Sequence, residues 1–334
     1  MTPTVVFDTY WRFASERLAM LYRRYREPAG PWTSDSILRS YRFTNVYRAA
    51  DRVSQYLIAE VQVREDRPQT PLELFFRTML FKIFNRIETW ESLEERFGPL
   101  EWRKLDLAKI DQALAELWLR GRKVYSAAYI MPSPLLGHAR KHSNHLALLK
   151  RMMEDRLPER VHQAPSLRSV YELILRYPGL GPFLAFQYTI DLNYSSLLEF
   201  KESEFVVAGP GALDGISKCF INTGGLTAEE VIYWVTDRQD AEFKRLGLEF
   251  PGLFGRRLQP IDCQNLFCEI SKYARVAHPD IGGIANRTRI KQSYRQNTRP
   301  IPKPKFPESW GIRVDDGVAV GATQRPEALT PTLF

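Results

Sequence analysis

Apolar positions recur with a helical period along most of the chain. From Leu72 to Gly98 they return about every 3.6 residues, which predicts a helix with one buried face. Similar patterns predict further helices at Tyr10–Tyr25, Ile37–Val61, Leu107–Leu119, Val124–Ile130, His138–Met153, Thr227–Leu246 and Cys263–Val276. Residues 205–208 suit a short strand, and no strand–helix–strand repeat is visible. The pattern therefore predicts a mainly α-helical fold with few or no strands.

The most specific local feature is a predicted hairpin of two helices. Residues 173–192 have the pattern of an apolar helix end, a Pro-Gly-Leu-Gly turn and a second helix that begins at Pro182. Gly179 and Gly181 permit positive φ and the close approach of another backbone. The second helix offers unpaired N–H groups and a positive dipole end. We therefore expect this turn to contact a nucleic-acid phosphate.

Two aspartates stand out as candidates for a catalytic carboxylate, Asp214 as the first choice and Asp191 as the second. Asp214 follows a Gly/Pro-rich loop, and its neighbouring glycines would leave room for a nucleotide. Asp191 lies within an otherwise apolar helix, where a carboxylate is costly unless it is paired or functional. The structural alternatives are a helix cap for Asp214 and, for Asp191, a core ion pair with an arginine such as Arg42 or Arg48.

Asp262 is the third candidate, with a helix N-cap as its structural alternative. A carboxylate close to a nucleotide sugar stabilises the oxocarbenium-like transition state of N-glycosidic bond cleavage and orients water. This chemistry requires neither a metal nor a nucleotide, and we expect no cofactor. His138, His142 and His145 have helical spacing, but an exposed polar face explains them better than a metal site.

Polar residues on the predicted helices are candidates for contacts with DNA or its bases. Arg42, Asn45, Arg48 and Arg52 would share a face of the predicted helix Ile37–Val61, although a solvated face explains the spacing alone better. Amides and tyrosines suit a pocket that reads a base edge. Together with the hairpin glycines, the remaining binding candidates are Lys82, Asn85, Gln187, Tyr194, Glu269, Lys272 and Tyr273.

The positive charge of the chain is local. The net charge of the chain is +8, and the segment from Arg287 to Lys305 contains seven basic residues and no acidic one. We therefore divide the chain into a helical catalytic region, residues 1–285, and a basic, Pro-rich, flexible tail, residues 286–334. Within the first region, residues 1–66 form N-terminal helices and residues 67–285 a core that contains the hairpin. No membrane-length apolar run or signal peptide is present, so we expect a cytoplasmic protein.

Several strings resemble a known family. They are RFTNVYR from Arg42, FKIFN from Phe81, VYSAAY from Val124, TIDLNYS from Thr189 and DCQNLFCE from Asp262. These strings look like the α-glutamyl/putrescinyl-thymine pyrophosphorylase family, which includes the helical domain of 5-hydroxymethyluracil DNA kinases. The order of hairpin, Gly/Pro-rich loop and aspartate resembles the helix-hairpin-helix DNA glycosylases. The family resemblance implies a glycosylase-like fold and an enzyme that recognises a bulky modified pyrimidine in DNA.

Two departures from the glycosylase pattern refine this expectation. Bifunctional members carry a Schiff-base lysine two residues after the second hairpin glycine, where this chain has Phe183. The resemblance therefore implies a monofunctional enzyme that leaves an abasic site. The carboxylate of those enzymes usually lies about twenty residues beyond the hairpin, and this chain has Lys201 there, between Asp191 and Asp214.

The resemblance leads to three hypotheses about function. The first is a DNA glycosylase that flips and excises a hydroxymethylated or glycosylated pyrimidine from phage DNA, as an anti-phage defence. The second is a transferase that attaches an amino acid or polyamine to an activated hydroxymethyluracil in DNA, with loss of pyrophosphate. The third is a non-catalytic binder of modified DNA. All three imply DNA as the partner, without a membrane or an obligate protein partner.

Overall fold

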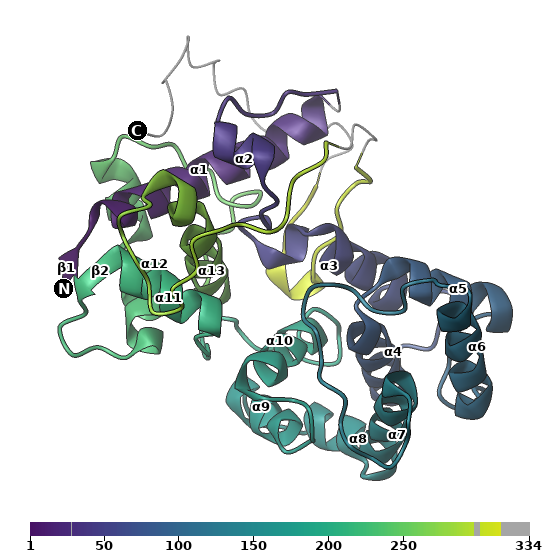
Figure 1. Cartoon of the computed structure of the whole chain (residues 1–334). Coiled ribbons are helices and arrows are strands. Elements are labelled where there is room, and N and C mark those ends of the chain that lie inside the picture. The colour runs from purple at the N-terminus through teal and green to yellow at the C-terminus, as the bar shows by residue number, and fades with distance from the viewer. Residues whose placement is uncertain (28, 297–300, 315–334) are drawn as a thin grey trace. The chain divides into compact units, whose positions relative to one another are not determined.

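In the computed structural model the chain is predominantly helical (Figure 1). The structure describes residues 1–27, 29–296 and 301–314. These residues form thirteen α-helices, and their strands are the antiparallel pair β1 (Thr2–Pro3) and β2 (Phe220–Asn222), with Thr2 opposite Asn222. The predicted mainly α fold is confirmed. Among the described helices, none combines the length and the apolar character needed to cross a membrane.

The chain divides into two compact units. Unit 1 contains Met1–Asp51, Val206–Pro304 and the described residues after Gly311, and unit 2 contains Arg52–Phe205 together with Lys305–Gly311. The chain therefore leaves unit 1 after Asp51 and returns to it at Val206. Of the predicted tail, residues 297–300 and 315–334 lie outside the described residues.

Unit 1 is built around two helices that approach each other closely. Gly215 in α11 lies against the backbone of α13, where a Cβ would be 2.0 Å from the carbonyl oxygen of Phe267. The N-terminus of α1 is capped by Thr4, whose hydroxyl also donates to the carbonyl oxygen of Lys218 in α11 at 2.5 Å. The elements of this unit are α1 (Val5–Arg26), α2 (Ser36–Ser40), η1 (Arg48–Ala50), α11 (Pro210–Cys219), α12 (Ala228–Arg245) and α13 (Pro260–Ala277).

Unit 2 is an all-helical unit around α4 (Pro71–Phe84). Every residue of α4 from Glu73 to Phe84 is buried, so this helix is enclosed on all sides and not only on the one face that its sequence predicts. Around it lie α3 (Arg52–Tyr56), η2 (Leu57–Gln62), α5 (Ile87–Phe97), α6 (Leu107–Leu119), α7 (Lys141–Glu154), α8 (Leu157–His162), α9 (Leu167–Leu175), α10 (Pro182–Leu192) and η3 (Glu308–Trp310). The segment η2 is a π-helix.

The predicted helix Ile37–Val61 is wrong. Helix α2 ends at Ser40, and residues 41–47 are irregular before η1 begins. The backbone N–H of Thr44 donates to a carboxylate oxygen of Glu269 at 3.0 Å, and that of Asn45 donates to Asp51 at 2.8 Å. Side-chain carboxylates thus take the place of helical carbonyls, and the chain does not continue as a helix.

Two further element predictions are wrong beside α4. The helix predicted for Leu72–Gly98 is two helices, because Asn85 adopts a left-handed conformation (φ 48°) that ends α4. Residues 124–130 form no helix, since the N–H of Ser126 donates to the carbonyl oxygen of Phe84 and the carbonyl oxygen of Val124 accepts from Thr89. Residues 205–208 form no strand.

Candidate functional site

The most unusual polar feature of unit 2 is a buried ion pair. Lys82 Nζ in the last turn of α4 lies 3.1 Å from Asp191 Oδ2 in α10. Lys82 is 2% exposed and Asp191 is fully buried. The sequence singled out both residues but assigned them separate roles, and the expected structural partner of Asp191 was an arginine. A charged pair in such surroundings is costly to desolvate, which makes it a candidate for function.

The surroundings of Lys82 hold its ammonium group in place. Lys82 Nζ donates to Asn85 Oδ1 at 2.8 Å, and Asn85 Nδ2 donates to the carbonyl oxygen of Ala128 at 3.3 Å. The ring of Tyr129 lies 5.0 Å from Nζ and stacks on the ring of Phe183. Tyr129 has a positive φ of 53°, uncommon for a tyrosine, within the irregular segment 126–130. This segment therefore lies against the ammonium group of Lys82.

Amide groups surround Asp191. Gln62 Nε2 donates to the main-chain carbonyl oxygen of Asp191 at 2.8 Å. Gln187 lies one helical turn before Asp191, is buried, and its Oε1 has no hydrogen-bond partner within the described part of the chain. Burial and the charge of Asp191 raise the pKa of Tyr188, so its hydroxyl stays neutral. The cluster thus combines one cation, one anion and three amides, which can hold an anionic group and a pyrimidine edge.

The predicted hairpin is present as α9, a turn and α10. Gly179 adopts φ 84°, and a Cβ there would be 3.2 Å from the carbonyl oxygen of Pro132. Gly181 instead has an ordinary φ of −70° as the N-cap of α10, without a side-chain cap. Gly181 and Pro182 are exposed. Contact of this turn with a DNA phosphate stays a prediction.

Asp214 lies in a separate, well-satisfied network of unit 1. It is 1% exposed, Oδ1 accepts from the N–H of Ala285 at 2.7 Å, and Oδ2 accepts from the hydroxyl of Ser271. Lys218 Nζ lies 3.9 Å away. A Cβ at Gly283 would collide with Oδ1 at 2.4 Å. The carboxylate thus fastens residues 283–285 to α11 and α13. The neighbouring glycines face α13 and do not leave open space.

Asp262 has the structural role that the sequence left open. Its Oδ2 accepts from the N–H of Gln259 at 3.0 Å, within a capping box at the start of α13. Further along α13, Glu269 pairs with Lys272 at 2.6 Å. The hydroxyl of Tyr273 donates to Asp35 at 2.6 Å. These three binding candidates therefore contact protein groups of unit 1.

The arginine ladder predicted for residues 42–52 does not form. Arg42 and Arg52 are exposed, whereas Arg48 is buried, and the four residues do not share one helix. Asn45 donates through Nδ2 to the carbonyl oxygen of Ala50 at 2.8 Å. Tyr194, in unit 2, is buried with its ring edge-on to Trp310.

The histidines do not gather into a metal site. In the described ranges no group of three or more His, Cys, Asp or Glu side chains could hold a metal ion. His145 is fully buried, its Nε2–H donates to the carbonyl oxygen of Pro132 at 3.0 Å, and Nδ1 accepts from the hydroxyl of Tyr125 at 2.8 Å. Desolvation lowers the pKa of His145 to about 4.

This histidine predicts a loss of stability in acid. Because its pKa is about 4 in the folded state and about 6.5 when unfolded, its contribution is complete above pH 6.5 and is lost as the pH falls towards 4. The loss is on the order of 3 kcal/mol. Urea unfolding between pH 4 and 7.5 should show a shallower pH dependence for His145→Gln than for the wild type. The exposed control His138→Gln should keep the wild-type slope, and equal slopes for all three proteins would refute the prediction.

Sequence reasoning missed several of the residues that complete these clusters. One is Gln62, whose Nε2 also donates to Thr78 Oγ1 at 3.0 Å, although a glutamine in the run LIAEVQV is a signal for a buried polar group. Tyr129 was read as part of a helix. Its position over Lys82 depends on the left-handed conformations of Asn85 and of Tyr129 itself, which the sequence does not reveal.

Comparison with known proteins establishes the family. The family model described as 5-hmdU DNA kinase, helical domain, matches residues 4–283. The chain belongs to this family. It is also 26% identical over 290 residues to the 5-hmdU DNA kinase of Bacillus phage SP10, an alignment that covers 81% of this chain and 45% of the relative. The chain thus spans slightly less than half the length of this curated relative. No solved structure matches the chain.

The family assignment contradicts the predicted DNA glycosylase activity. Both the family and its phage member are named for a kinase that acts on 5-hmdU in DNA, and not for release of a base. The prediction of an N-glycosidic bond hydrolase that leaves an abasic site in anti-phage defence is therefore wrong. The resemblance to the 5-hydroxymethyluracil DNA kinase helical domain is confirmed, whereas none of these matches shows a link to DNA glycosylases.

Proposed function

We propose that this protein acts on 5-hydroxymethyluracil in DNA and modifies the 5-hydroxymethyl group while the base stays attached to its deoxyribose. The match of residues 4–283 to the helical domain of 5-hmdU DNA kinases carries this proposal. The reaction we favour is the attachment of an amine to an already activated hydroxymethyl group, with loss of pyrophosphate. This is a transferase reaction that enlarges the base and does not remove it.

The chemistry of this transfer has two electrostatic demands. The amine nitrogen attacks the methylene carbon, the carbon–oxygen bond breaks, and pyrophosphate leaves with the electron pair while the nitrogen loses a proton. A cation beside the leaving group stabilises its developing charge, and a carboxylate can accept the proton. Lys82 and Asp191, 3.1 Å apart, supply both charges. We propose Lys82 for the pyrophosphate and Asp191 for the amine.

Recognition of the base requires hydrogen bonds to its polar edge. Asn85 and Gln187 supply amides on either side of the ion pair, and the Oε1 atom of Gln187 is an acceptor without a partner in the described chain. The N3–H group of a uracil would donate a hydrogen bond to this oxygen. Because Tyr129 lies against the ammonium group of Lys82, entry of the base requires the segment 126–130 to move aside.

Phosphorylation of the hydroxymethyl group is the second candidate, and the name of the phage relative favours it. The hydroxyl oxygen would attack the terminal phosphorus of ATP, and ADP would leave. Lys82 would again face the transferred anionic group. The two reactions start from different groups at the 5-methylene carbon, but both leave the base attached to its deoxyribose, so the change in oligonucleotide mass separates them.

An assay of intact oligonucleotide mass tests the proposal. Oligonucleotides with one 5-hydroxymethyluracil are incubated with ATP and Mg²⁺, and those with a pyrophosphorylated hydroxymethyl group are incubated with amino acids and diamines. We expect the second set to exchange pyrophosphate for an amine. A phosphate added to the first set would favour the kinase reaction instead. Unchanged masses in both sets, with no preference for modified over unmodified DNA in binding, would refute the proposal.

Gln187→Met tests the role of the base-reading amide. We expect at least a tenfold loss of turnover, corresponding to about 1.4 kcal/mol, with little loss of stability because Oε1 gives up no protein hydrogen bond. The matched control is Gln163→Met, an exposed glutamine at the end of α8. Equal turnover in the two variants would show that Gln187 does not contact the substrate.

A further inference from the structure

Unit 2 holds one leucine almost entirely in the solvent. Leu135 belongs to the loop of residues 132–140, which connects the segment 126–130 to α7. Its side chain is 93% exposed, more than any other large apolar side chain in the part of the chain that the structure describes. A single exposed leucine is common on protein surfaces and needs no explanation by itself. The hydrogen bonds of its loop and the charges around it distinguish Leu135.

A buried asparagine fixes the conformation of the loop. Asn144 in α7 is 3% exposed, and its Oδ1 accepts from the N–H groups of Leu136 at 2.9 Å and His138 at 3.2 Å. Its Nδ2 donates to the carbonyl oxygens of His138 at 2.7 Å and Arg140 at 3.2 Å. These four bonds satisfy the amide completely and tie down the chain directly after Leu135. The leucine is therefore presented by a preformed loop.

The start of the loop packs against the helical hairpin. The carbonyl oxygen of Pro132 accepts from His145 at 3.0 Å. A Cβ at Gly179, in the hairpin turn, would lie 3.2 Å from this same oxygen and 3.7 Å from Pro134 Cβ. The loop and the hairpin turn thus form one continuous surface of unit 2, and the chain is held on both sides of Leu135.

The loop is also close to the candidate functional site. Met131, the residue before the loop, is 1% exposed, and its Sδ accepts from the hydroxyl of Tyr188 at 3.7 Å. Tyr188 follows Gln187 in α10, one turn before Asp191. Leu135 is four residues from Met131, so their Cα atoms lie within roughly 14 Å of each other. The exposed leucine is therefore near the site proposed for the base.

The chain around the loop is basic. Between Glu116 and Glu154 the sequence contains seven Lys and Arg residues and no Asp or Glu, and we call residues 117–153 the basic span. Lys150 and Arg151 pair with acids that follow the span. The other five basic residues form no ion pair within the described part of the chain: Arg120, Arg122, Lys123, Arg140 and Lys141. All of these except Lys141 are exposed. Their charges are thus available to a polyanion.

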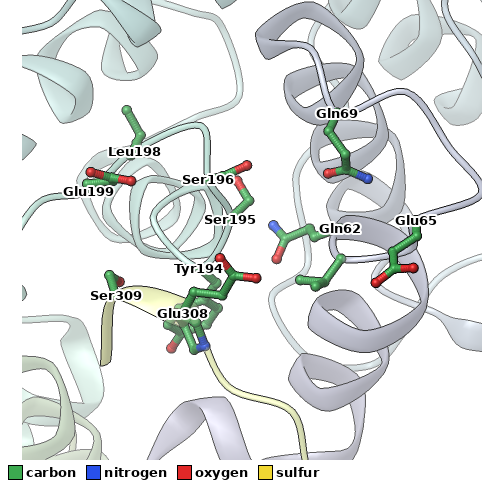
Figure 2. Close-up of a pocket in the computed structure, with 12 residues that line it drawn as sticks. Gln62, Glu65, Gln69, Tyr194, Ser195, Ser196, Leu198, Glu199, Glu308 and Ser309 are labelled. Atoms are coloured by element: carbon green, nitrogen blue, oxygen red, sulfur yellow. The ribbon is translucent and has the colours of Figure 1, made fainter. Parts of the chain in front are cut away.

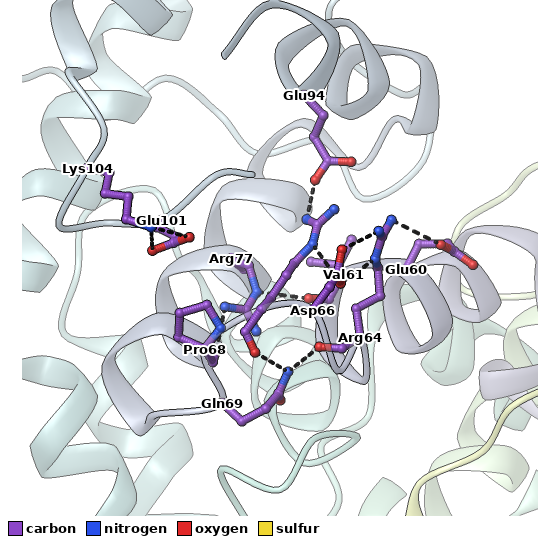
Figure 3. Close-up of polar contacts among 11 residues, drawn as sticks. Glu60, Val61, Arg64, Asp66, Pro68, Gln69, Arg77, Glu94, Glu101 and Lys104 are labelled. Atoms are coloured by element: carbon purple, nitrogen blue, oxygen red, sulfur yellow. Dashed lines mark hydrogen bonds and ion pairs between the residues drawn. The ribbon is translucent and has the colours of Figure 1, made fainter. Parts of the chain in front are cut away.

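Other polar features of unit 2 do not suit a polyanion. The guanidinium groups of Arg64 and Arg77 are engaged by the carboxylate of Asp66 and by main-chain carbonyl oxygens (Figure 3). A cavity of about 220 Å³ has no basic group among its described lining residues, and its carboxylates come from Glu65, Glu199 and Glu308 (Figure 2). Those carboxylates repel phosphates. Within unit 2, the basic span is therefore the part that favours a DNA backbone.

We propose that Leu135 enters the base stack of duplex DNA and fills the space that the modified base leaves. This inference rests on the proposed function, which places the base beside Lys82 and Asp191. Because Asp191 is fully buried, a base inside a duplex cannot reach it and must leave the stack. A fixed apolar side chain between base steps replaces lost stacking contacts, while Arg140 and the other cations hold phosphates. The DNA substrate is thus double-stranded and opened at one base pair.

Fluorescence of 2-aminopurine next to the modified base tests this insertion without turnover, because stacking quenches this base analogue. Duplexes with 5-hydroxymethyluracil or its pyrophosphorylated form are titrated with the full chain, without ATP or an amine. We expect a saturable rise in fluorescence with the wild type. Leu135→Ala should abolish most of the rise and weaken duplex binding by about tenfold, because the apolar contact is lost. Leu135→Met should retain both, and Leu119→Ala, at an exposed leucine that ends α6, is the matched control.

Two readouts separate insertion from a general effect on the protein. Leu135→Ala should keep the wild-type free energy of unfolding and the wild-type affinity for the single strand of the same sequence, since no base stack is opened there. Arg140→Gln should reduce the slope of log Kd against log salt concentration by about 0.9, the value for one phosphate contact. Leu135→Ala should leave this slope unchanged, because it removes no charge.

The outcomes also separate this inference from the proposed function. If the wild type prefers modified DNA but Leu135→Ala and Leu119→Ala give equal fluorescence, insertion of Leu135 is overturned and the proposed function stands. The same holds if Leu135→Ala weakens binding to the single strand as much as to the duplex. If the wild type shows no preference for modified over unmodified duplex, the proposed function and the insertion of Leu135 both fail.

Discussion

Replacing Gly215 with alanine should lower the free energy of unfolding by about 3 kcal/mol or more. The added methyl group would lie 2.0 Å from the carbonyl oxygen of Phe267 and 2.7 Å from its carbonyl carbon. Both are backbone atoms of α13, so no side-chain rotation relieves the collision, and α11 and α13 must separate. The greater helix propensity of alanine, about 1 kcal/mol, offsets only part of this loss. Urea unfolding followed by circular dichroism measures the effect.

A second glycine of unit 1 provides the control for this substitution. Gly282 has no positive φ, and a Cβ there would meet no atom within 4 Å. Gly282→Ala should therefore change the free energy of unfolding by no more than about 0.5 kcal/mol. If Gly215→Ala were as stable as Gly282→Ala, the close approach of α11 and α13 would be refuted.

Replacing Lys82 with methionine should lower the free energy of unfolding by roughly 3–5 kcal/mol. The variant keeps the volume of the side chain but leaves Asp191 as a buried carboxylate without its ammonium partner, 3.1 Å away in the wild type. It also removes the donor to Asn85 Oδ1. Chemical denaturation at neutral pH measures the loss.

The double variant Lys82→Met with Asp191→Leu separates the cost of an orphaned charge from that of altered packing. Removing both charges should recover most of the loss, because no uncompensated charge remains buried. Lys104→Met is the control, since Lys104 is mostly exposed beside Glu101 and should contribute within about 0.5 kcal/mol. If Lys82→Met were as stable as Lys104→Met, Lys82 and Asp191 would not interact in the folded protein.

Local signals in the sequence predict much of the helical framework. Helices Leu107–Leu119 and Thr227–Leu246 agree closely with α6 and α12, because Asp106 and Thr227 are strong N-caps. The hairpin is also predicted from local signals, because the glycine and proline residues of its turn fix the backbone conformation of the residues next to them. Features that depend on residues adjacent in the chain are therefore accessible without a fold.

Features that depend on distant residues are not accessible in this way. The helix predicted for Ile37–Val61 fails because Glu269, far along the chain, takes the N–H of Thr44. Asp191 was recognised as costly, but its partner Lys82 could not be identified before α4 and α10 were placed together. Glu308 lies in the predicted tail, so its place within unit 2 could not be predicted either.

The failed functional prediction has a chemical cause. A hairpin followed by a carboxylate is compatible with several reactions at a modified pyrimidine, and only the comparison with known families distinguishes among them. The carboxylate of Asp214, the first choice, accepts hydrogen bonds from the hydroxyl of Ser271 and the N–H of Ala285. Asp262 belongs to a capping box, close to its structural alternative, whereas Asp214 lies inside α11 and is not a cap. Asp191 forms the buried ion pair of its own structural alternative, with Lys82 in place of an arginine.

The fate of the modified base tests the central claim most directly. DNA with pyrophosphorylated 5-hydroxymethyluracil, carrying ¹⁴C at the 5-methylene carbon, is incubated with the protein and an amine and then separated into polymer and small molecules. We expect the label to stay in the polymer and, after digestion to nucleosides, to elute as a nucleoside enlarged by the amine. Label released as free base would contradict the account, and so would label that remains in the unchanged starting nucleoside.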